Sequence, residues 1–183
     1  MTYSIDIAGL KRDLPICKVT DDLYIGAFVM FGDVELTEHC ARELLARAPE
    51  FDYLMAPEAK AIPLVYEMAR QSGNNKYIVA RKHAKAYMPE TIEVEVRSIT
   101  TDAVQKLIID ANDAALIRGK RVLLVDDVIS TGESIRAVQE LAEKAGATVA
   151  GKATPLAEGD AYYRTDIIAL AQLPLFNADG TRK

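Results

Sequence analysis

Residues 121–134 read Arg-Val-Leu-Leu-Val-Asp-Asp-Val-Ile-Ser-Thr-Gly-Glu-Ser, and this stretch decides the fold class because its character changes twice. Val122 to Val125 is an apolar run of the length expected for a strand that is buried on both faces of a parallel sheet. Asp126 and Asp127 follow immediately. They therefore fall at the carboxyl end of the strand, which is the edge where open α/β sheets bind their ligands.

A loop rich in hydroxyl groups follows the two aspartates. It consists of Ser130, Thr131, Gly132, Glu133 and Ser134. The glycine lets the backbone turn tightly, so that three hydroxyls and successive N–H groups can converge on one anion. Apolar residues at 135, 138, 141, 142 and 145 predict a helix that begins at this loop, and the free N–H groups of a helix start favour phosphate.

The acids and the loop together predict the kind of ligand. Two carboxylates beside a phosphate site repel a bare polyanion, so the ligand should bring hydroxyl groups or a divalent metal to them. A phosphorylated sugar meets both conditions. One alternative is a buried strand and a capped helix with incidental acids. Another is a receiver-type acidic pair, but receivers carry that pair after their first strand, whereas here it lies two-thirds along the chain.

The run Val122 to Ser134 resembles the signature of the type I phosphoribosyltransferases, enzymes that bind 5-phosphoribosyl-1-pyrophosphate (PRPP). The resemblance implies that Asp126 and Asp127 contact the ribose hydroxyls as part of the catalytic site, that Val128 borders the base, and that residues 130–134 surround the 5′-phosphate. It also implies Mg²⁺ as the cofactor. PRPP would carry the metal, with Asp126 and Asp127 as its candidate protein contacts.

Composition bounds the class of protein. With 183 residues, the chain is long enough for one well-buried domain and short for two. No apolar run is long enough to span a membrane, and Met1 to Ala8 lacks the features of a signal peptide, so we expect a cytoplasmic protein. The net charge of −5 argues against general nucleic-acid binding. Cys17 and Cys40 lack metal-ligand spacing and are expected to be reduced thiols.

A second strand end carries charged residues. Phe51 to Ala56 reads as a short buried strand, and the loop after it, with Glu58, Ala59 and Lys60, leads into a helix predicted over residues 61–71. This loop resembles the Glu-Ala-basic loop that holds pyrophosphate in adenine phosphoribosyltransferases, where a non-proline cis peptide is frequent. The alternative is that Glu58 and Lys60 form a solvated pair.

A third strand end is basic. The predicted strand Lys76 to Ala80 leads to Arg81, Lys82 and His83. Arg81 and Lys82 resemble the Arg-Lys pair that contacts pyrophosphate in purine transferases, and they supply the charge that this leaving group requires. His83 is a further candidate, although a lone histidine is more often structural.

Residues 84–110 resemble the mobile two-stranded flap that closes over PRPP and excludes water. Apolar positions 92, 94 and 96, and then 104, 107 and 109, predict its two strands, with residues 98–102 between them. Thr100 and Thr101 stand where many adenine-specific members carry a Glu-Tyr pair. In this respect the flap resembles that of bacterial xanthine transferases, and no flap carboxylate is assigned as a catalytic acid.

The chain ends are assigned to a hood. Residues 1–36 show no clean periodicity, and with about 174–183 they are expected to form a small cap over the nucleobase. Tyr24 and Phe28 are candidates to stack on the base, with core positions as the alternative for each ring. Residues 37–173 complete one domain that spans 1–183. Its expected architecture is α/β, a Rossmann-like parallel sheet with helices on both faces, as in the type I phosphoribosyltransferase fold.

The remaining elements follow from local signals. Thr37 is the predicted cap of a helix that runs to about Ala48, and Gly146 is expected to end the central helix. Strands are predicted over Thr148 to Ala153 and Ile167 to Leu173. The tail of residues 177–183 is expected to be frayed.

The expected activity is purine salvage, in which a 5-phosphoribosyl group passes from PRPP to a purine and pyrophosphate leaves. Adenine, giving AMP, is favoured because Glu158 stands near the place where similar xanthine and hypoxanthine-guanine transferases carry a lysine that donates to the 6-oxo group. One alternative is that Glu158 is only a solvated turn residue, and another is that Lys152 turns inward and favours an oxopurine. Further alternatives are an orotate transferase and a non-catalytic PRPP-sensing regulator. A homodimer is expected because the family commonly dimerises.

Overall fold

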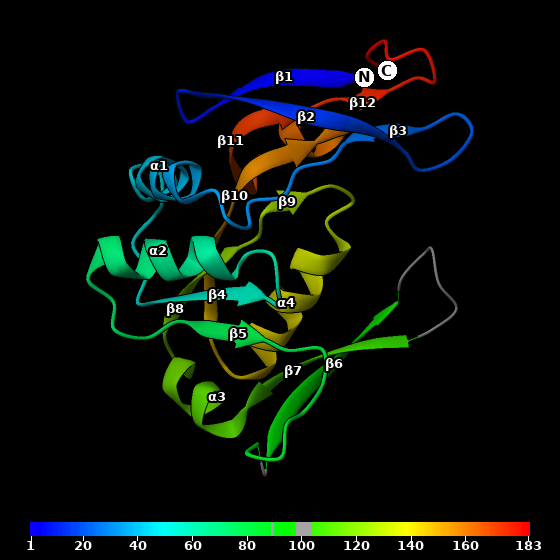
Figure 1. The fold of residues 1–183 in the computed structure, drawn as a ribbon. Helices are drawn as coiled ribbons and strands as arrows, with labels where there is room; N and C mark the ends of the chain where they lie inside the picture. The colour runs from blue at the N-terminus through cyan, green and yellow to red at the C-terminus, as the bar shows by residue number, and fades with distance from the viewer. Residues whose placement is uncertain (89, 98–103) are drawn as a thin grey trace.

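A parallel sheet with the strand order β11-β10-β8-β4-β5 lies at the centre of the computed structural model, which describes residues 1–88, 90–97 and 104–183 (Figure 1). The strands are β4 (Tyr53–Pro57), β5 (Ile78–Ala80), β8 (Arg121–Val125), β10 (Thr148–Glu158) and β11 (Ile167–Leu173). All neighbouring pairs in this order are parallel. The predicted α/β class with a parallel sheet is therefore confirmed.

Helices cover both faces of the sheet, as predicted (Figure 1). One core joins α1 (Val34–Leu45) and α2 (Ile62–Ser72) to one face, and a second core joins α3 (Ala111–Ile117) and α4 (Glu133–Lys144) to the other. Strand β8 supplies both cores, with Leu123 in the first and Leu124 in the second. Successive side chains of a strand point to opposite faces, which explains why this strand is apolar throughout. No helix in the described ranges is long and apolar enough to cross a membrane.

A two-stranded hairpin occupies the predicted place of the flap. Strands β6 (Thr91–Arg97) and β7 (Val104–Asp110) pair antiparallel, from Thr91 opposite Asp110 to Arg97 opposite Val104. Val94, Leu107 and Ile109 pack into the second core, and the other end of the hairpin projects away from the sheet (Figure 1). Thr100 and Thr101, on which the comparison with xanthine transferases rested, lie outside the described residues.

The two chain ends share a second sheet, with the order β1-β2-β3-β12 (Figure 1). Its strands are β1 (Thr2–Ile7), β2 (Leu10–Lys18), β3 (Tyr24–Gly26) and β12 (Leu175–Phe176), all paired antiparallel. The individual strands within residues 1–36 were not predicted, because this part of the sequence shows no clean periodicity. Buried and exposed residues alternate over β1, but the alternation is interrupted in β2. Too few consecutive residues therefore follow the two-residue period of a strand for this pair to be predicted from the sequence.

The tail is also more ordered than predicted. It reverses direction and returns to β12, with the Lys183 amide donating to the Leu175 carbonyl over 2.8 Å. The reversal uses Gly180, whose φ of +83° is open to glycine at no steric cost.

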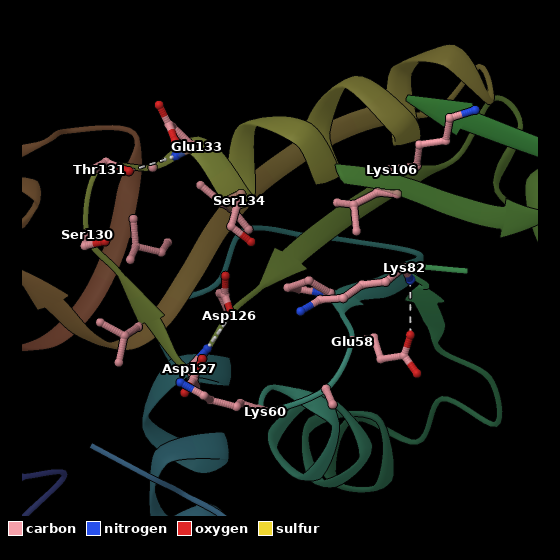
Figure 2. A pocket seen from close by; sticks show the side chains of 17 residues that line it. Glu58, Lys60, Lys82, Lys106, Asp126, Asp127, Ser130, Thr131, Glu133 and Ser134 are labelled. Atoms are coloured by element: carbon pink, nitrogen blue, oxygen red, sulfur yellow. Dashed lines mark hydrogen bonds between the residues drawn. The ribbon is translucent and has the colours of Figure 1, made fainter. Parts of the chain in front are cut away.

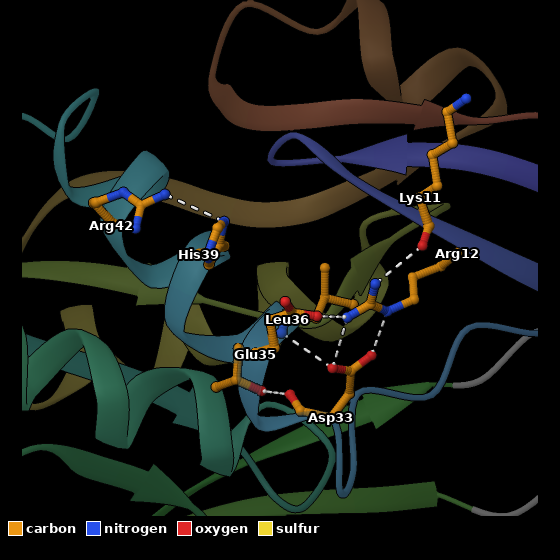
Figure 3. Close-up of polar contacts among 8 residues, drawn as sticks. Lys11, Arg12, Asp33, Glu35, Leu36, His39 and Arg42 are labelled. Atoms are coloured by element: carbon orange, nitrogen blue, oxygen red, sulfur yellow. Dashed lines mark hydrogen bonds and ion pairs between the residues drawn. The ribbon is translucent and has the colours of Figure 1, made fainter.

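An ion-pair cluster ties the second sheet to α1 (Figure 3). Arg12 of β2 donates to both carboxylate oxygens of Asp33, over 2.6 and 3.0 Å, and to Glu35 over 2.9 Å. Asp33 also caps α1 by accepting from the Leu36 amide over 3.0 Å. The Arg12 hydrogen bond is the main reason that the pKa of Asp33 lies below its usual range. The assignment of Thr37 as the cap was wrong, because that residue lies inside the helix and is buried.

Other elements begin or end at different residues from those predicted, because long-range strand pairing overrides local sequence signals. Strand β10 continues five residues beyond the predicted end, to Glu158, and its pairing with β11 passes over Pro155, which has no N–H to offer. Helix α4 begins two residues early, at Glu133. The short helix α3 was not predicted; Asp110 caps it by accepting from the Asn112 amide over 2.7 Å.

Candidate active site at the carboxyl edge of the sheet

A cavity of about 390 Å³ lies at the carboxyl edge of the central sheet (Figure 2). Its walls come from the ends of β4, β5 and β8, the loop that enters α4, and strand β7. The described lining residues are Pro57, Glu58, Ala59, Lys60, Lys82, Lys106, Leu107, Asp126, Asp127, Val128, Ile129, Ser130, Thr131, Gly132, Glu133, Ser134 and Ile135. Three strand ends that are distant in sequence thus meet here, together with the predicted phosphate loop.

The two aspartates sit where the chain bends away from the sheet. Strand β8 ends at Val125, and pairing with β10 resumes at β9 (Val128–Ile129). Between them, the Asp126 amide still donates to the Ala153 carbonyl over 3.1 Å, and the Asp127 amide donates to Asp126 Oδ1 over 2.9 Å. Asp126 and Asp127 are only 6% and 7% exposed, so both carboxyl groups lie in a nearly dry place.

Burial controls the charge of this pair. Loss of water, followed by the proximity of Asp127, raises the pKa of Asp126 to about 8. Burial also raises the pKa of Asp127, and the nearby Lys60 ammonium opposes that shift. Asp127 Oδ2 is buried and has no hydrogen-bond partner within the described part of the chain. An acceptor of this kind favours a ligand that brings a hydroxyl group or a cation.

The phosphate loop begins α4. Gly132 stands just before the helix with φ +84°, and the Arg136 amide donates to its carbonyl over 2.9 Å to close the first turn. A Cβ at this position would meet the guanidinium of Arg164. Asp166 holds that guanidinium by accepting from its Nε and Nη2 over 3.0 and 2.9 Å. The position therefore favours glycine for its backbone angle, and a larger residue would also have to displace the end of the Arg164 side chain.

Cations line the side of the cavity opposite the loop. Lys60, Lys82 and Lys106 come from three different elements. Glu58 connects two strand ends, because its amide donates to the Ala80 carbonyl over 2.8 Å and its Oε2 accepts from the Lys82 amide over 3.1 Å. Lys60 lies beside Asp127 rather than in a solvated pair with Glu58 (Figure 2). The peptide bond between Glu58 and Ala59 is cis, as the resemblance implied.

This combination of acid pair, phosphate loop and cations has counterparts among known proteins. The family described as Phosphoribosyl transferase domain matches residues 35–172. The chain belongs to this family. A phosphoribosyltransferase named for adenine, from Kosmotoga olearia, is 30% identical over 160 residues, which cover 80% of this chain and 84% of that protein. One named for xanthine, from Clostridium tetani, is 29% identical over 127 residues, which cover 65% of this chain and 63% of that protein.

Solved structures agree on the fold. The crystal structure of an adenine phosphoribosyltransferase from Thermoanaerobacter pseudethanolicus matches with a TM-score of 0.61 at 26% identity and covers 76% of this chain and 82% of that chain. The chain is thus a type I phosphoribosyltransferase in sequence and architecture.

The acidic side of this phosphoribosyltransferase fits a magnesium ion that the donor carries. In the described ranges, no three His, Cys, Asp or Glu side chains gather to hold a metal by themselves. Two carboxyl groups, one with an unpartnered buried oxygen, suit a hard cation that takes its remaining ligands from phosphates and water. Asp126 and Asp127 are the residues that would touch it.

Arg81 is placed differently from the other predicted pyrophosphate residues of this phosphoribosyltransferase. Its guanidinium lies over the Tyr87 ring, 5.9 Å from the centroid, and lines a separate cavity of about 550 Å³ rather than the main one. It stays near Glu58, with Nη1 and Oε1 4.0 Å apart. His83 is exposed and is not part of the main lining. A pyrophosphate contact for Arg81 stays a prediction.

The base-binding candidates are dispersed. Val128 lines the cavity, whereas Tyr24 and Phe28 do not. Phe28 is 6% exposed and belongs to the first core, while Tyr24 pairs with Phe176 in the hood sheet. The exposed aromatic side chain in the segment between β3 and α1 is that of Phe31, which is 51% exposed. Sequence reasoning chose Phe28 because both rings lie in one apolar run, where only packing distinguishes them.

Glu158 and Lys152 lie on different faces of β10. Glu158 ends the strand on the face of Leu156, which packs in the first core, towards the hood. It is half-buried, and loss of water raises its pKa, although it does not line the main cavity. Lys152 lies on the α4 side, where its Nζ donates to Asp166 over 2.7 Å. It is not turned towards the hood.

Sequence reasoning missed several lining residues, of which Lys106 is the charged one. The alternation of apolar residues in β7 predicts that Leu107 and Ile109 lie on the face packed against the second core. Lys106 must then lie on the opposite face of the strand. The docking of the hairpin beside the phosphate loop, which brings Lys106 to the cavity, is a long-range contact without a local sequence signal.

Proposed function

We propose that this phosphoribosyltransferase serves purine salvage, transferring the 5-phosphoribosyl group of PRPP to a purine with release of pyrophosphate. Adenine is its preferred acceptor, and AMP its product. The observation that supports this function is the composition of one cavity. A buried acid pair, a helix-start phosphate loop and a set of lysines line it, and they match the ribose, the 5′-phosphate and the diphosphate of a single donor.

The residues present account for the chemistry by positioning and electrostatics. Asp126 and Asp127 accept hydrogen bonds from the ribose hydroxyls and hold the sugar carbon C1 in place. The bond between C1 and the diphosphate oxygen breaks, its electron pair leaves with the diphosphate, and Lys60 and Lys82 stabilise that charge. A purine nitrogen gives its lone pair to C1, and its proton passes to the departing diphosphate or to solvent. Mg²⁺, bound through the donor's phosphates, would neutralise further charge.

Two side chains on opposite faces of β10 favour adenine over an oxopurine. Glu158 offers a half-buried acceptor on the hood side, which suits an amino group and repels a carbonyl oxygen. Lys152, the cation that could donate to a carbonyl, is paired with Asp166 on the other side. The Kosmotoga relative, named for adenine, supports the same acceptor. The Clostridium relative keeps xanthine as the second candidate.

We propose further that the enzyme works in the cytoplasm as a homodimer. Val34 is 76% and Tyr66 is 55% exposed, and both line an apolar cavity of about 410 Å³ beside the starts of α1 and α2. Exposed apolar side chains that cluster in this way are typical of contacts between subunits. Sedimentation of wild type and of Val34→Glu tests the dimer, because the added charge should shift the protein towards monomer.

A single assay tests the function. The protein is incubated with PRPP and Mg²⁺ and, separately, with adenine, hypoxanthine, guanine, xanthine or orotate, and pyrophosphate release is measured. Adenine should give the highest kcat/KM, and Glu158→Gln should reduce its lead over hypoxanthine. An oxopurine preferred by more than about tenfold, equivalent to about 1.4 kcal/mol, would exclude the adenine assignment. PRPP binding without release for any base would instead indicate a regulator.

A further inference from the structure

Lys106 has no role in the reaction as described so far, yet it lines the same cavity as Lys60 and Lys82. It belongs to strand β7 of the hairpin, whereas the other two lysines lie in the loop after β4 and at the end of β5. Figure 2 shows it at the rim of the cavity, across the view from Ser130 and Thr131. The hairpin therefore places a lysine at the rim of the site, with its ammonium turned outward to Glu93 rather than into the cavity.

The backbone fixes where this cation can act. Arg81 and Ile108 exchange both amide hydrogen bonds, each 2.8 Å long, so that β7 is joined to the end of β5 beside Lys82. Lys106 lies two residues from Ile108 and shares its face of the strand. Leu107, on the opposite face, packs in the second core while also lining the cavity, and it holds that register. Lys106 is thus anchored close to the diphosphate cations by contacts that do not involve its own side chain.

The ammonium of Lys106 is held by a partner that it can leave. Its Nζ lies 2.6 Å from Glu93 Oε1 on β6, and the two side chains are 44% and 45% exposed. The hydrogen bond with Glu93 raises the pKa of Lys106, so the side chain stays charged. Exposed ion pairs are weak because water screens them, and a lysine stem rotates freely. A diphosphate, with several negative charges in the cavity, is a stronger partner than one exposed carboxylate.

We propose that Lys106 is a further diphosphate-binding residue, which exchanges Glu93 for the diphosphate of the donor when PRPP binds and returns to Glu93 when pyrophosphate leaves. This inference rests on the proposed function, since it takes the cavity to be the PRPP site. Only hydrogen bonds are exchanged, and no covalent step is added. Glu93 then acts as a competitor for the cation rather than as part of the site.

The two partners of the ion pair give opposite effects under this proposal, and this distinguishes it from a structural role. Lys106→Met should weaken pyrophosphate binding about tenfold and raise the KM for PRPP similarly, because it removes one charge-assisted hydrogen bond. Lys106→Arg should retain most of the affinity. Glu93→Gln should tighten pyrophosphate binding by about two- to fivefold, because the competing charge is removed. Titration calorimetry with pyrophosphate and Mg²⁺, without a base, measures all three.

Lys144→Met is the matched control. The Nζ of Lys144 in α4 donates to the Glu93 carbonyl over 2.9 Å and so also supports the hairpin, but Lys144 is not among the cavity residues. Its loss should leave pyrophosphate affinity unchanged, with thermal unfolding of every variant as the check on folding. The proposal is overturned if Lys106→Met binds pyrophosphate as wild type does, or if Lys106→Met and Glu93→Gln weaken binding equally.

The experiment separates this inference from the proposed function. Wild type that binds pyrophosphate and PRPP but transfers to none of the purines would exclude the transferase assignment and leave the Lys106 comparison readable. Wild type that binds no pyrophosphate would exclude both.

Discussion

The acidic and basic sides of the cavity are built in different ways. Asp126 and Asp127 follow the buried residues of β8 and are almost inaccessible, and an Asp126 oxygen accepts from the Asp127 amide. Lys60, Lys82 and Lys106 are long side chains at the rim, where they come from separate elements. The fold therefore sets the geometry of the acids before any ligand arrives, whereas the lysines reach their positions by rotation. The acids should be irreplaceable and the lysines individually replaceable.

The largest expected effect is on the acidic side. Asp126→Asn or Asp127→Asn should lower kcat/KM by about 10²-fold or more, equivalent to about 3 kcal/mol, because each replaces a carboxyl oxygen that can accept from a ribose hydroxyl with an NH₂ group that cannot. Steady-state assays with PRPP measure the loss, and thermal unfolding serves as the control, since neither carboxyl group is needed for packing. Near-normal activity, or unfolding of both variants, would contradict the assignment.

A smaller effect is expected on the basic side. Lys82→Met should raise the KM for PRPP by about tenfold, the value of one charge-assisted contact, while Lys82→Arg stays within a few-fold of wild type. Initial rates at varied PRPP give both constants. If Lys82→Met matched the loss seen for the aspartate variants, the contrast between a fixed and an adaptable side would fail.

The third prediction concerns stability and pH. Burial raises the pKa of Asp126 from 3.8 to about 8, so between those values the native state retains a proton that the unfolded state has lost. Its contribution to the stability of the native state is therefore full below about pH 4 and is lost as the pH rises from about 4 through 8. Asp126→Asn removes this titrating group. The free energy of unfolding of the variant minus that of wild type should therefore be larger at pH 8 than at pH 5, by at least about 1.4 kcal/mol. Denaturant unfolding at both pH values measures the difference, and an equal gain would contradict the raised pKa.

The smallest change is expected in the hairpin. PRPP with Mg²⁺ should slow amide hydrogen exchange over residues 84–97, because ligand on the basic side binds the strand pair that carries Lys106. Mass spectrometry of peptic fragments measures the rates with and without ligand, and fragments from α1 serve as the internal reference. Unchanged exchange at saturation would remove the hairpin from the binding step.

The same contrast explains what the sequence could predict. The acidic side and the phosphate loop lie within residues 121–134, so a strand, a turn and a helix start could be read from consecutive residues. Lys106 reaches the cavity through the link between Arg81 and Ile108, which are 27 positions apart, and no local pattern announces it. Two of the charged loops, after β4 and β5, were recognised because both follow short apolar strands.

The hood was the least predictable part for the same physical reason. Its sheet joins residues 2–26 to Leu175 and Phe176, so the pairing depends on the whole chain being folded between them. The cap of α1 was misplaced because Asp33 also serves Arg12 of β2, a partner that local helix rules do not include. Burial of Phe28 rather than Phe31 depends on the same packing.

The contact between Gly132 and Arg164 has a consequence for how this protein can vary. The space of a single methyl group is shared by two positions that are 32 residues apart in sequence. A residue with a side chain at position 132 would displace the end of Arg164 and disturb its hydrogen bonds with Asp166, so the glycine is replaced more easily when the arginine is shortened as well. Libraries randomised at both sites should recover paired solutions that single-site libraries lack. A strained turn with φ +84° narrows those pairs further, to residues such as asparagine at position 132.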